Sequence, residues 1–411
     1  MSDARDRPTT TPDGGSGATG PAGDGAGDRD GTAAPSGPLA GVRVVELGGI
    51  GPAPFGCMLL ADMGAEVVRV DRASQAGDPG AVDRALVRGR TSVTVDLKQP
   101  EGVDVVLRLT DAADVLVEGF RPGVAERLGV GPDVVRGRNP RLVYGRMTGW
   151  GQEGPYAQAP GHDLNYLALT GVLHAIGRGD RPVAPLNLIG DFGGGGALLA
   201  SGVVAALFER ERSGRGQTVD VAMVDGAGQL ATAIHGMRHE GFWEDDREAN
   251  LLDGGAHFYD VYATKDGRFV SVAAIEPQFY AALLQGMGLD ADELGPQDDR
   301  SRWPANSARF AEVFAGRTRD EWCAVLEPLG ACFAPVLSLD EAPHHAHAVA
   351  RRGFVEVDGH AVPAPAPRFD RTPATAGRAP VPAGTDTDAT LADAGFTTDE
   401  IEALRAAGAV A

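Results

Sequence analysis

The chain contains little cysteine. Only three of its 411 residues are cysteines, Cys57, Cys323 and Cys332, and no two of them form a C-x-x-C pair. A small and odd number of thiols argues against a disulfide framework, which secreted proteins of low core volume use. We therefore expect a protein of the reducing cytoplasm.

Basic residues are also scarce. There are 37 lysines and arginines against 57 aspartates and glutamates, which gives a formal net charge of −20. Non-specific binding of nucleic acid requires a basic surface, so this class of function is excluded. The overall charge still permits a local basic pocket for phosphate groups.

Long hydrophobic runs are missing. No apolar signal core is present at the N-terminus, and the longest apolar stretch, about 197–208, ends at the charged residue Glu209. Such a stretch is too short to cross a bilayer as a helix. We expect no membrane partner.

Aromatic residues are absent from residues 1–38, which consist largely of Gly, Asp, Pro, Thr and Ser. A segment of this kind cannot bury enough apolar surface to offset its ordering entropy, so we predict a disordered tail. The remaining length exceeds that of one ordinary core and predicts two domains. We assign 39–223 to a large domain completed by 350–411, 224–258 to a linker, and 259–349 to a small α+β domain.

A βαβ unit opens the ordered region. The apolar run Val42–Leu47 precedes a glycine-rich turn, a helical segment covers Phe55–Met63, and a second apolar run covers Glu66–Val70. This succession of elements is typical of a parallel βαβ unit.

The turn of this unit partly imitates a nicotinamide dinucleotide site. Gly49 and Gly51 precede Asp71 by about the spacing expected of a ribose-binding acid. Pro54 occupies the position of the third glycine, however, and Pro52 stiffens the turn. Nicotinamide binding is therefore only weakly indicated.

More strand-like runs alternate with helical segments along the large domain. These runs cover residues 92–97, 114–118, 141–147 and 218–223. The alternation predicts an α/β fold with a doubly wound parallel sheet. Four basic residues lie at or near the ends of its elements, where such sheets bind ligands and where phosphates would fit: Arg72, Lys98, Arg121 and Arg127.

A different pattern begins after the linker. Two strand-like runs, 259–264 and 269–274, flank an Asp-Gly turn and predict a β-hairpin. Glu276 follows at a strand-to-helix junction, a common position for a functional carboxylate, although Pro277 at the first helical position also makes Glu276 a plain N-cap candidate. Two further helices, about 304–315 and 319–329, complete the predicted small domain.

A cluster of histidines near the end of this domain suggests a metal site at first sight. His344, His345 and His347 lack the H-x-x-x-H spacing of a helical zinc site and a nearby set of carboxylates. We predict an exposed loop here and no metal.

The segment Gly161–Leu199 carries the strongest catalytic signal. It places His162 29 residues before Asp191, which Phe192 and the four glycines 193–196 follow. Two proton-accepting side chains of different type suit a reaction that removes a proton from one face of a carbon and returns it to the other. The glycines permit positive φ and close approach of a ligand, and a helix is predicted to start at Ala197, so that Asp191 lies in the loop before it. Taken singly, each of these features also fits an ordinary surface turn.

Seven segments in the same order resemble the family III CoA-transferase superfamily (CaiB/BaiF) and, within it, the alpha-methylacyl-CoA racemases. The segments are GVRVVELGGIGPAP (41–54), TVDLK (94–98), EGFRPGVAERLG (118–129), YGRMTGWGQEGP (144–155), GHDLNY (161–166), LNLIGDFGGGG (186–196) and IEPQFY (275–280). The resemblance covers the chain from residue 38 to about 370. It implies an interlocked homodimer whose active site lies between the large domain of one subunit and the small domain of its partner.

The resemblance also implies roles for individual residues. His162 and Asp191 match the two catalytic bases, Glu276 the group that holds the histidine, and Asn187 a group hydrogen-bonded near the aspartate. The positions that match CoA contacts are Ile50, Arg72, Val95, Leu97, Lys98 and Arg127. The chain is one residue shorter than the family pattern within 181–185, a deletion that we expect the loop to absorb.

The implied reaction is 1,1-proton transfer at C2 of a 2-methylacyl-CoA, through an enolate. Backbone N–H groups near Asp191 and the following helix N-terminus are the expected oxyanion donors. No cofactor is required, because charge develops on a single oxygen and CoA is part of the substrate. The alternative is a CoA-transferase in which Asp191 is the nucleophile and forms an aspartyl-CoA thioester. A non-catalytic CoA-binding protein is a third class, against which the set of His162, Asp191 and Glu276 argues.

Overall fold

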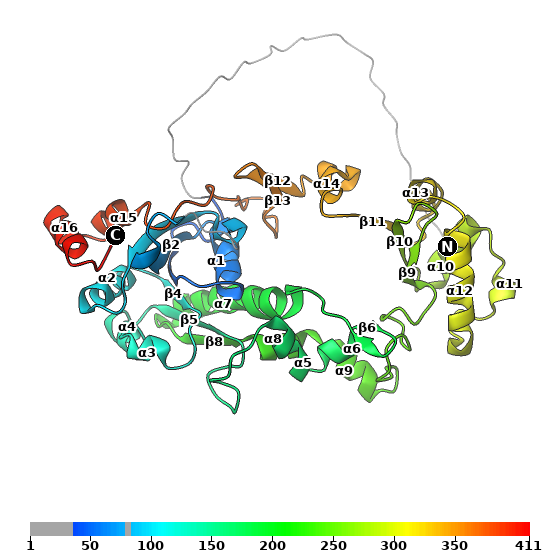
Figure 1. The fold of residues 1–411 in the computed structure, drawn as a ribbon, viewed down its shortest axis with the longest axis horizontal. Coiled ribbons are helices and arrows are strands. Elements are labelled where there is room, and N and C mark those ends of the chain that lie inside the picture. The colour runs from blue at the N-terminus through cyan, green and yellow to red at the C-terminus, as the bar shows by residue number, and fades with distance from the viewer. Residues whose placement is uncertain (1–35, 79–83) are drawn as a thin grey trace, which may run out of the picture. The chain divides into compact units, whose positions relative to one another are not determined.

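Six parallel strands form the central sheet (Figure 1). In this computed structural model, residues 36–78 and 84–411 are described, and the tail predicted for residues 1–38 lies outside that range except for its last three residues. The strands are β1 (Arg43–Leu47), β2 (Glu66–Arg72), β3 (Arg90–Val95), β4 (Val115–Glu118), β5 (Val143–Thr148) and β8 (Thr218–Ala222). They are ordered β3-β2-β1-β4-β5-β8, and every neighbouring pair is parallel. The prediction of a doubly wound parallel sheet is confirmed.

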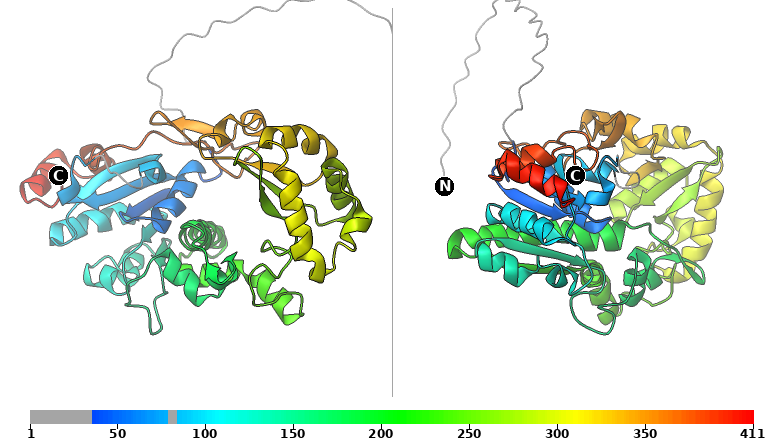
Figure 2. Two further views of the ribbon diagram at one scale, coloured as in Figure 1. Left: turned by 45° about the vertical axis from the view of Figure 1, so that its right-hand side comes forward. Right: turned by 60° about the vertical axis from the view of Figure 1, so that its left-hand side comes forward.

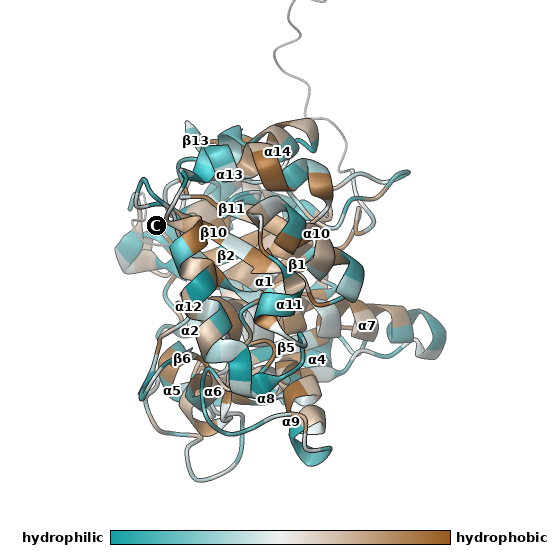
Figure 3. Ribbon diagram, turned by 90° about the vertical axis from the view of Figure 1, so that its right-hand side faces the viewer, coloured by the Kyte–Doolittle hydropathy of each residue, from teal (hydrophilic) through white to brown (hydrophobic). Residues whose placement is uncertain are grey.

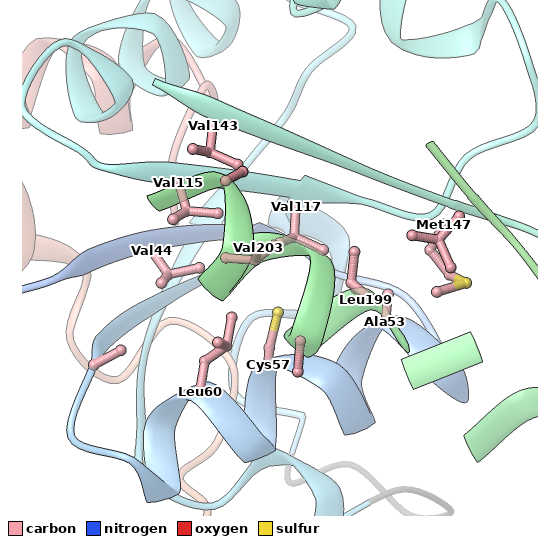
Figure 4. Packing of buried hydrophobic residues seen from close by; sticks show 14 of the residues in the cluster. Val44, Ala53, Cys57, Leu60, Val115, Val117, Val143, Met147, Leu199 and Val203 are labelled. Atoms are coloured by element: carbon pink, nitrogen blue, oxygen red, sulfur yellow. The ribbon is translucent and has the colours of Figure 1, made fainter. Parts of the chain in front are cut away.

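The side chains of the strands alternate between two hydrophobic cores, as the two-residue period of a strand requires. Val44 contributes to one core and Val45 to the other. The first core packs the sheet against α1 (Pro52–Asp62) and α7 (Leu198–Ser213), and Figure 4 shows its valines and leucines around Cys57. The second core uses helices of the opposite face, namely α2 (Pro100–Asp111), α3 (Val124–Arg127), α4 (Pro132–Arg138), α15 (Thr387–Asp393) and α16 (Thr398–Ala406). A capping box starts the last helix, with the Thr397 side chain accepting from the Glu400 N–H.

The helix at the centre of the first core is longer than predicted. A π-helix, η3 (Leu188–Ala197), runs directly into α7, so that 26 residues are continuously helical and include an 18-residue window of mean hydropathy 1.5. The expectation that this apolar stretch is too short to span a bilayer was therefore wrong about its length. Its burial explains its composition: α7 lies against the sheet, seen nearly end-on in the left view of Figure 2, and its C-terminal end is hydrophilic (Figure 3). A buried core helix passes the same test of length and composition as a membrane span.

Two helices follow the last strand of the sheet. They are α8 (Met223–Leu230) and α9 (Thr232–His239), and an irregular segment leads from them to residue 258. The segment predicted as a linker thus begins with regular helical structure.

The small α+β region has its own core. The predicted hairpin is confirmed as the antiparallel pair β9 (Tyr259–Ala263) and β10 (Phe269–Ala273). A third strand, β11 (Phe333–Val336), pairs with β10 and was missed, because its sequence F-A-P-V contains a proline that disfavours a strand. The helices of this region are α10 (Pro277–Met287), α11 (Ala291–Leu294), α12 (Trp303–Phe314) and α13 (Arg319–Leu326).

The remaining elements are short. They are the 3-10 helices η1 (Ala73–Gln75), η2 (Arg84–Val87), η4 (Arg300–Arg302), η5 (Glu327–Leu329) and η6 (Ala342–His344), the helices α5 (Asp163–Leu169), α6 (Val172–Ala175) and α14 (Ala346–Ala350), and the paired strands β6 (Gly177–Arg178) with β7 (Arg181–Pro182) and β12 (Phe354–Val357) with β13 (His360–Pro363). The histidines predicted to lie in a loop instead belong to η6, to α14 and to the junction between them, where His345 is the N-cap of α14. Within the two described ranges, no group of three His, Cys, Asp or Glu residues could hold a metal ion.

A buried histidine makes the small core sensitive to acid. His257 is fully buried between aromatic rings, and its Nε2 lies 2.7 Å from the hydroxyl of Tyr280. Burial lowers the pKa of His257 from 6.5 to about 4. Because the folded-state pKa is the lower one, the unfolded state binds the proton first, and stability present above pH 6.5 is lost as the pH falls toward 4.

We expect this single group to reduce the free energy of unfolding by about 3 kcal/mol between pH 7 and pH 4. Urea denaturation at a series of pH values measures the effect. The variant His257→Phe, which fills the site with a ring that does not titrate, should show a correspondingly flatter profile than the wild type. Identical pH profiles for the two proteins would contradict the prediction.

Candidate active site

The carboxyl ends of the strands share one edge of the sheet, and most of the predicted CoA-contact residues lie there. Ile50 follows β1 and is 77% exposed, Arg72 ends β2, and Leu97 and Lys98 follow β3. Arg127 ends the short helix after β4. The strand order reverses between β1 and β4, which is the position where sheets of this topology bind ligands.

Basic side chains at this edge form no close ion pairs with carboxylates of the described residues. Arg72, Lys98, Arg121 and Arg127 are exposed, and none of them forms an ion pair with a carboxylate inside residues 36–78 and 84–411. Arg146 within β5 provides the contrast, since Glu118 and Glu126 neutralise it at 3.0 and 2.9 Å. In an acidic chain, cations that remain unpaired at a ligand-binding edge favour an anionic ligand.

Val95 differs from the other predicted contacts. Its side chain is 2% exposed and belongs to the second core, and its main chain forms a bridge with Val410. Within the described chain, Val95 is therefore buried as a whole residue and supports the strand end from below. The acid of the apparent dinucleotide pattern is likewise engaged, because Asp71 accepts hydrogen bonds from Arg69 at 2.9 Å and from Ser92 at 2.7 Å.

Asp191 lies in the first turn of the π-helix η3, not in a loop before a helix. The prediction was wrong at this point because four successive glycines were taken as a turn. None of the glycines 193–196 has a positive φ. They are needed for close packing: a Cβ on Gly194 would lie 2.5 Å from the amide nitrogen of Ala227, and one on Gly196 would lie 2.5 Å from the carbonyl oxygen of Pro52. The glycines thus allow η3 to lie directly against α1 and α8.

The carboxylate of Asp191 faces the N-terminus of α1. A Cβ on Gly51, the N-cap residue of α1, would lie 3.6 Å from Oδ2 of Asp191, and Gly51 has a φ of 71° that favours glycine. The positive end of the α1 dipole therefore stabilises negative charge at Asp191. The amide of Asn187 donates to the same oxygen at 3.3 Å, and the rings of Phe55 and Phe192 lie 4.8 Å apart and join the two helices.

His162 is the N-cap residue of α5 and is exposed. The side chain of Asn165 accepts from its backbone N–H at 3.1 Å, which fixes the start of the helix. The imidazole is therefore presented to solvent from a defined backbone position.

A residue that the sequence did not reveal joins the two predicted bases. Asp163 directly follows His162, is 6% exposed, and accepts a hydrogen bond from the N–H of Asp191 at 2.7 Å. The start of α5 is thereby attached to the first turn of η3. The same bond occupies the Asp191 amide, so this N–H group is not available as the oxyanion donor that the sequence predicted.

Tyr166 lies beside this junction. Its hydroxyl donates to the carbonyl of Gly161. Burial, followed by the negative charges of Asp191 and Asp163, raises the pKa of Tyr166 to about 12. The phenol therefore stays neutral at physiological pH and serves as a packing and hydrogen-bonding group, not as a base.

Among the described residues of a single chain, Glu276 makes no contact with either of the two predicted bases. It is the N-cap of α10 with Pro277 at the first helical position, it makes no side-chain capping bond, and it is exposed. Within the part of the chain that the structure describes, its carboxylate forms no hydrogen bond or ion pair with His162 or Asp191. Its geometry as a helix N-cap leaves the carboxylate available to another molecule.

A cavity of about 730 Å³ lies next to η3. Ile189, two residues before Asp191, and Leu230, which lies against Gly193, both line it. The rest of the wall is largely apolar, and its two arginines are already paired, Arg178 with Asp260 and Glu248 and Arg238 with Asp245. The cavity thus suits an uncharged hydrocarbon group better than an anion.

Comparisons with known proteins agree with this arrangement. Residues 39–387 match the model of CoA-transferase family III. An alpha-methylacyl-CoA racemase of Mus musculus is 48% identical over 367 residues, which are 88% of this chain and 95% of the mouse protein. The alpha-methylacyl-CoA racemase of Homo sapiens is 47% identical over 369 residues, 89% of this chain and 96% of the human protein. The crystal structure of Rv3272 from Mycobacterium tuberculosis aligns with a TM-score of 0.71 at 29% identity, over 86% of this chain and 99% of that one.

Proposed function

This chain belongs to CoA-transferase family III, and from that premise we propose that it is an alpha-methylacyl-CoA racemase. Such an enzyme interconverts (2R)- and (2S)-2-methylacyl-CoA thioesters. The observation that carries the proposal is the hydrogen bond that attaches the helix of His162 to the turn of Asp191, because it makes the two backbone segments that carry acid–base groups of different type neighbours. The racemases named above, which match nearly the whole described chain, support the same activity.

The CoA moiety is proposed to lie along the carboxyl edge of the sheet. Arg72, Lys98 and Arg127 would bind its phosphates, since these exposed side chains form no close ion pair in the described ranges. Ile50 and Leu97 would pack against its apolar parts, and the buried Val95 would support the end of β3 beneath them. Neighbouring strands are spaced about 4.8 Å apart, so the ends of β3, β2 and β1 offer a track of about 10 Å for an extended ligand.

The proposed chemistry uses two bases on opposite faces of C2. One of His162 and Asp191 removes the α-proton, and the conjugate acid of the other delivers a proton to the opposite face of the enolate. Asn187 holds the carboxylate of Asp191 through the 3.3 Å hydrogen bond. No cofactor is required in this scheme, because the charge that develops resides on the thioester oxygen.

Glu276 is proposed to act from a partner subunit. As a carboxylate it would orient the imidazole of His162 and stabilise its charged form. The exposed position of Glu276 and the lack of a bond to His162 within the described chain support a homodimer whose active site is shared. We further place the enzyme in the cytoplasm, in keeping with its three free cysteines.

The competing function within the family is CoA transfer with Asp191 as the nucleophile. That reaction needs a free carboxylic acid as acceptor and has no use for a second base. The apolar cavity with its neutralised arginines favours the uncharged chain of an acyl-CoA over a carboxylate acceptor. We therefore assign the cavity to the acyl chain.

Solvent exchange tests the proposed reaction. Purified enzyme given a (2R)-2-methylacyl-CoA in D₂O should incorporate deuterium at C2 and form both epimers without any acceptor, as mass spectrometry and chiral chromatography would show. Incorporation that requires an added free carboxylate would contradict the racemase assignment and favour the transferase. A sample without enzyme gives the background exchange of the thioester.

A further inference from the structure

We propose that the side chain of Asp163 is a positioning residue for this reaction. It fixes the backbone of Asp191 and thereby sets the carboxylate of that residue relative to His162. The inference rests on the proposed function, in which His162 and Asp191 act on opposite faces of one carbon. It adds a residue to which the sequence gave no role.

The hydrogen bond of Asp163 caps the first turn of η3 from outside the helix. The first N–H groups of a helix lack partners within it and are usually satisfied by the side chain of the N-cap residue. The N-cap residue here, Asn187, makes no such bond, and its amide nitrogen donates to the Asp191 carboxylate. Asp163 supplies the missing acceptor at the N–H of Asp191 itself, at 2.7 Å. The helical turn that carries a proposed base is therefore held at that residue.

Burying the carboxylate of Asp163 costs desolvation free energy, and a purely structural role does not explain why this cost is tolerated. Asp163 is 6% exposed, and its Oδ2 is buried with no hydrogen-bond partner among the described residues. A buried and unpaired carboxylate oxygen is unfavourable, and a neutral side chain could accept the same hydrogen bond with less desolvation. A charged acceptor, however, gives a shorter and stronger bond to a backbone N–H than a neutral one does. The structure thus favours accuracy of position at Asp191 over stability.

The hydrogen bond of Asp163 sets the relative position of the two backbone segments that carry His162 and Asp191. Asp163 is the residue after His162, so the bond connects the main chains of the two bases although they are 29 positions apart in the sequence. Gly190, directly before Asp191, leaves room for this contact, since a Cβ there would lie 2.5 Å from Oδ1 of Asp163. Two separate substitutions can therefore disturb the same contact, one from each side.

The test compares inversion with exchange for each epimer of one 2-methylacyl-CoA in D₂O. In Asp163→Ala we expect kcat for inversion to fall about 100-fold with KM unchanged within about twofold, because a displacement of about 1 Å at a reacting group costs about this factor. The epimer whose C2 proton faces His162 should still exchange that proton at a rate within about threefold of the wild type, since His162 itself is not displaced. Asp163→Asn, which keeps an oxygen acceptor, should restore inversion to within about fivefold of the wild type.

Gly190→Ala disturbs the same hydrogen bond while the carboxylate of Asp163 is retained. It should also lower kcat for inversion without changing KM, and its effect should not add to that of Asp163→Ala if both act through one contact. Two matched controls are available. Asp114→Ala removes a similar bond, 2.8 Å to the N–H of Arg43 at the opposite edge of the sheet, together with an ion pair to Arg210, and Gly137→Ala adds a Cβ that meets nothing within 4 Å.

Three outcomes would overturn the role of Asp163. They are full inversion by Asp163→Ala, an equal loss of exchange for both epimers, and a failure of Asp163→Asn to improve on Asp163→Ala. If Asp163→Ala does not fold, Gly190→Ala and Asp163→Asn decide the question by the same ratio of inversion to exchange. Absence of exchange in the wild type would instead overturn the racemase assignment, and the role of Asp163 with it.

Discussion

Replacing His162 with alanine should lower the rate of C2 inversion by about 10³-fold, within the range that a positioned general acid–base contributes. The same loss is expected for Asp191→Ala, because inversion requires one group to accept a proton and the other to donate one. The two losses should not add in the double variant, since groups that act together in one step are not independent. Chiral analysis of the product after single turnovers measures the rate.

Hydrogen–deuterium exchange at C2 should distinguish the roles of the two bases. With His162 removed, Asp191 can still take a proton from its own face of C2 and return deuterium to that face, so one epimer exchanges without inversion. With Asp191 removed, the other epimer should do so. A two-base enzyme thus predicts opposite epimer preferences for the two single variants, and mass spectrometry of each recovered epimer detects them.

His239→Ala is a suitable control, because His239 ends α9, is exposed and has no part in the proposed site. Unchanged inversion in His162→Ala would contradict the two-base scheme. A transferase predicts a different result: Asp191→Ala would lose acyl transfer and formation of an aspartyl thioester, whereas His162→Ala would keep both.

Replacing Arg90 with methionine should lower the free energy of unfolding by about 3–5 kcal/mol, the usual result of removing one partner of a buried ion pair. Arg90 and Glu46 are 2% and 0% exposed, and their Nε and Oε2 atoms are 2.7 Å apart. Burial raises the pKa of Glu46, although the charge of Arg90 opposes that rise. The guanidinium also donates to the carbonyls of Leu86 and Pro54, so its loss releases the first turn of α1 as well.

Urea denaturation measures this effect, and an exposed pair provides the control. Arg309 and Glu312 are 3.2 Å apart on the surface of α12, so Arg309→Met should change the free energy of unfolding by no more than about 0.5 kcal/mol. The double variant Arg90→Met with Glu46→Met should regain much of the stability lost by Arg90→Met alone, because no buried charge is left unpaired. Equal effects of Arg90→Met and Arg309→Met would show that the buried pair does not stabilise the fold.

The strands of the sheet were predictable because their signal is local. Runs such as Val42–Leu47 are apolar, short and bounded by glycine, and parallel strands buried on both faces have this composition. The hairpin at Asp266-Gly267 was equally clear, since the turn chemistry and the flanking strands lie within a few residues. β11 was missed because its proline disfavours a strand locally and its pairing with β10 is a contact distant in sequence.

The glycines after Asp191 were misjudged for a related reason. Along the sequence, four glycines indicate a turn, because glycine lowers helix propensity. The structure shows a helix, since close packing of η3 against α1 and α8 leaves no space for side chains at these positions. Tertiary packing outweighed local propensity here, and no pattern within the segment records the neighbouring helices.

The sequence by itself determined the class of fold, the succession of strands and helices along most of the large domain, and the candidate bases. These features depend on residue type, periodicity and motifs, which are local. Only the tertiary structure decided how the bases are held. Asp163 looks like any helix-start aspartate in the sequence, and it acquires its role through a bond to an amide 28 positions away. A short side chain can reach such a partner only after the chain has folded, because the distance between them is set by the packing of η3 against its neighbours.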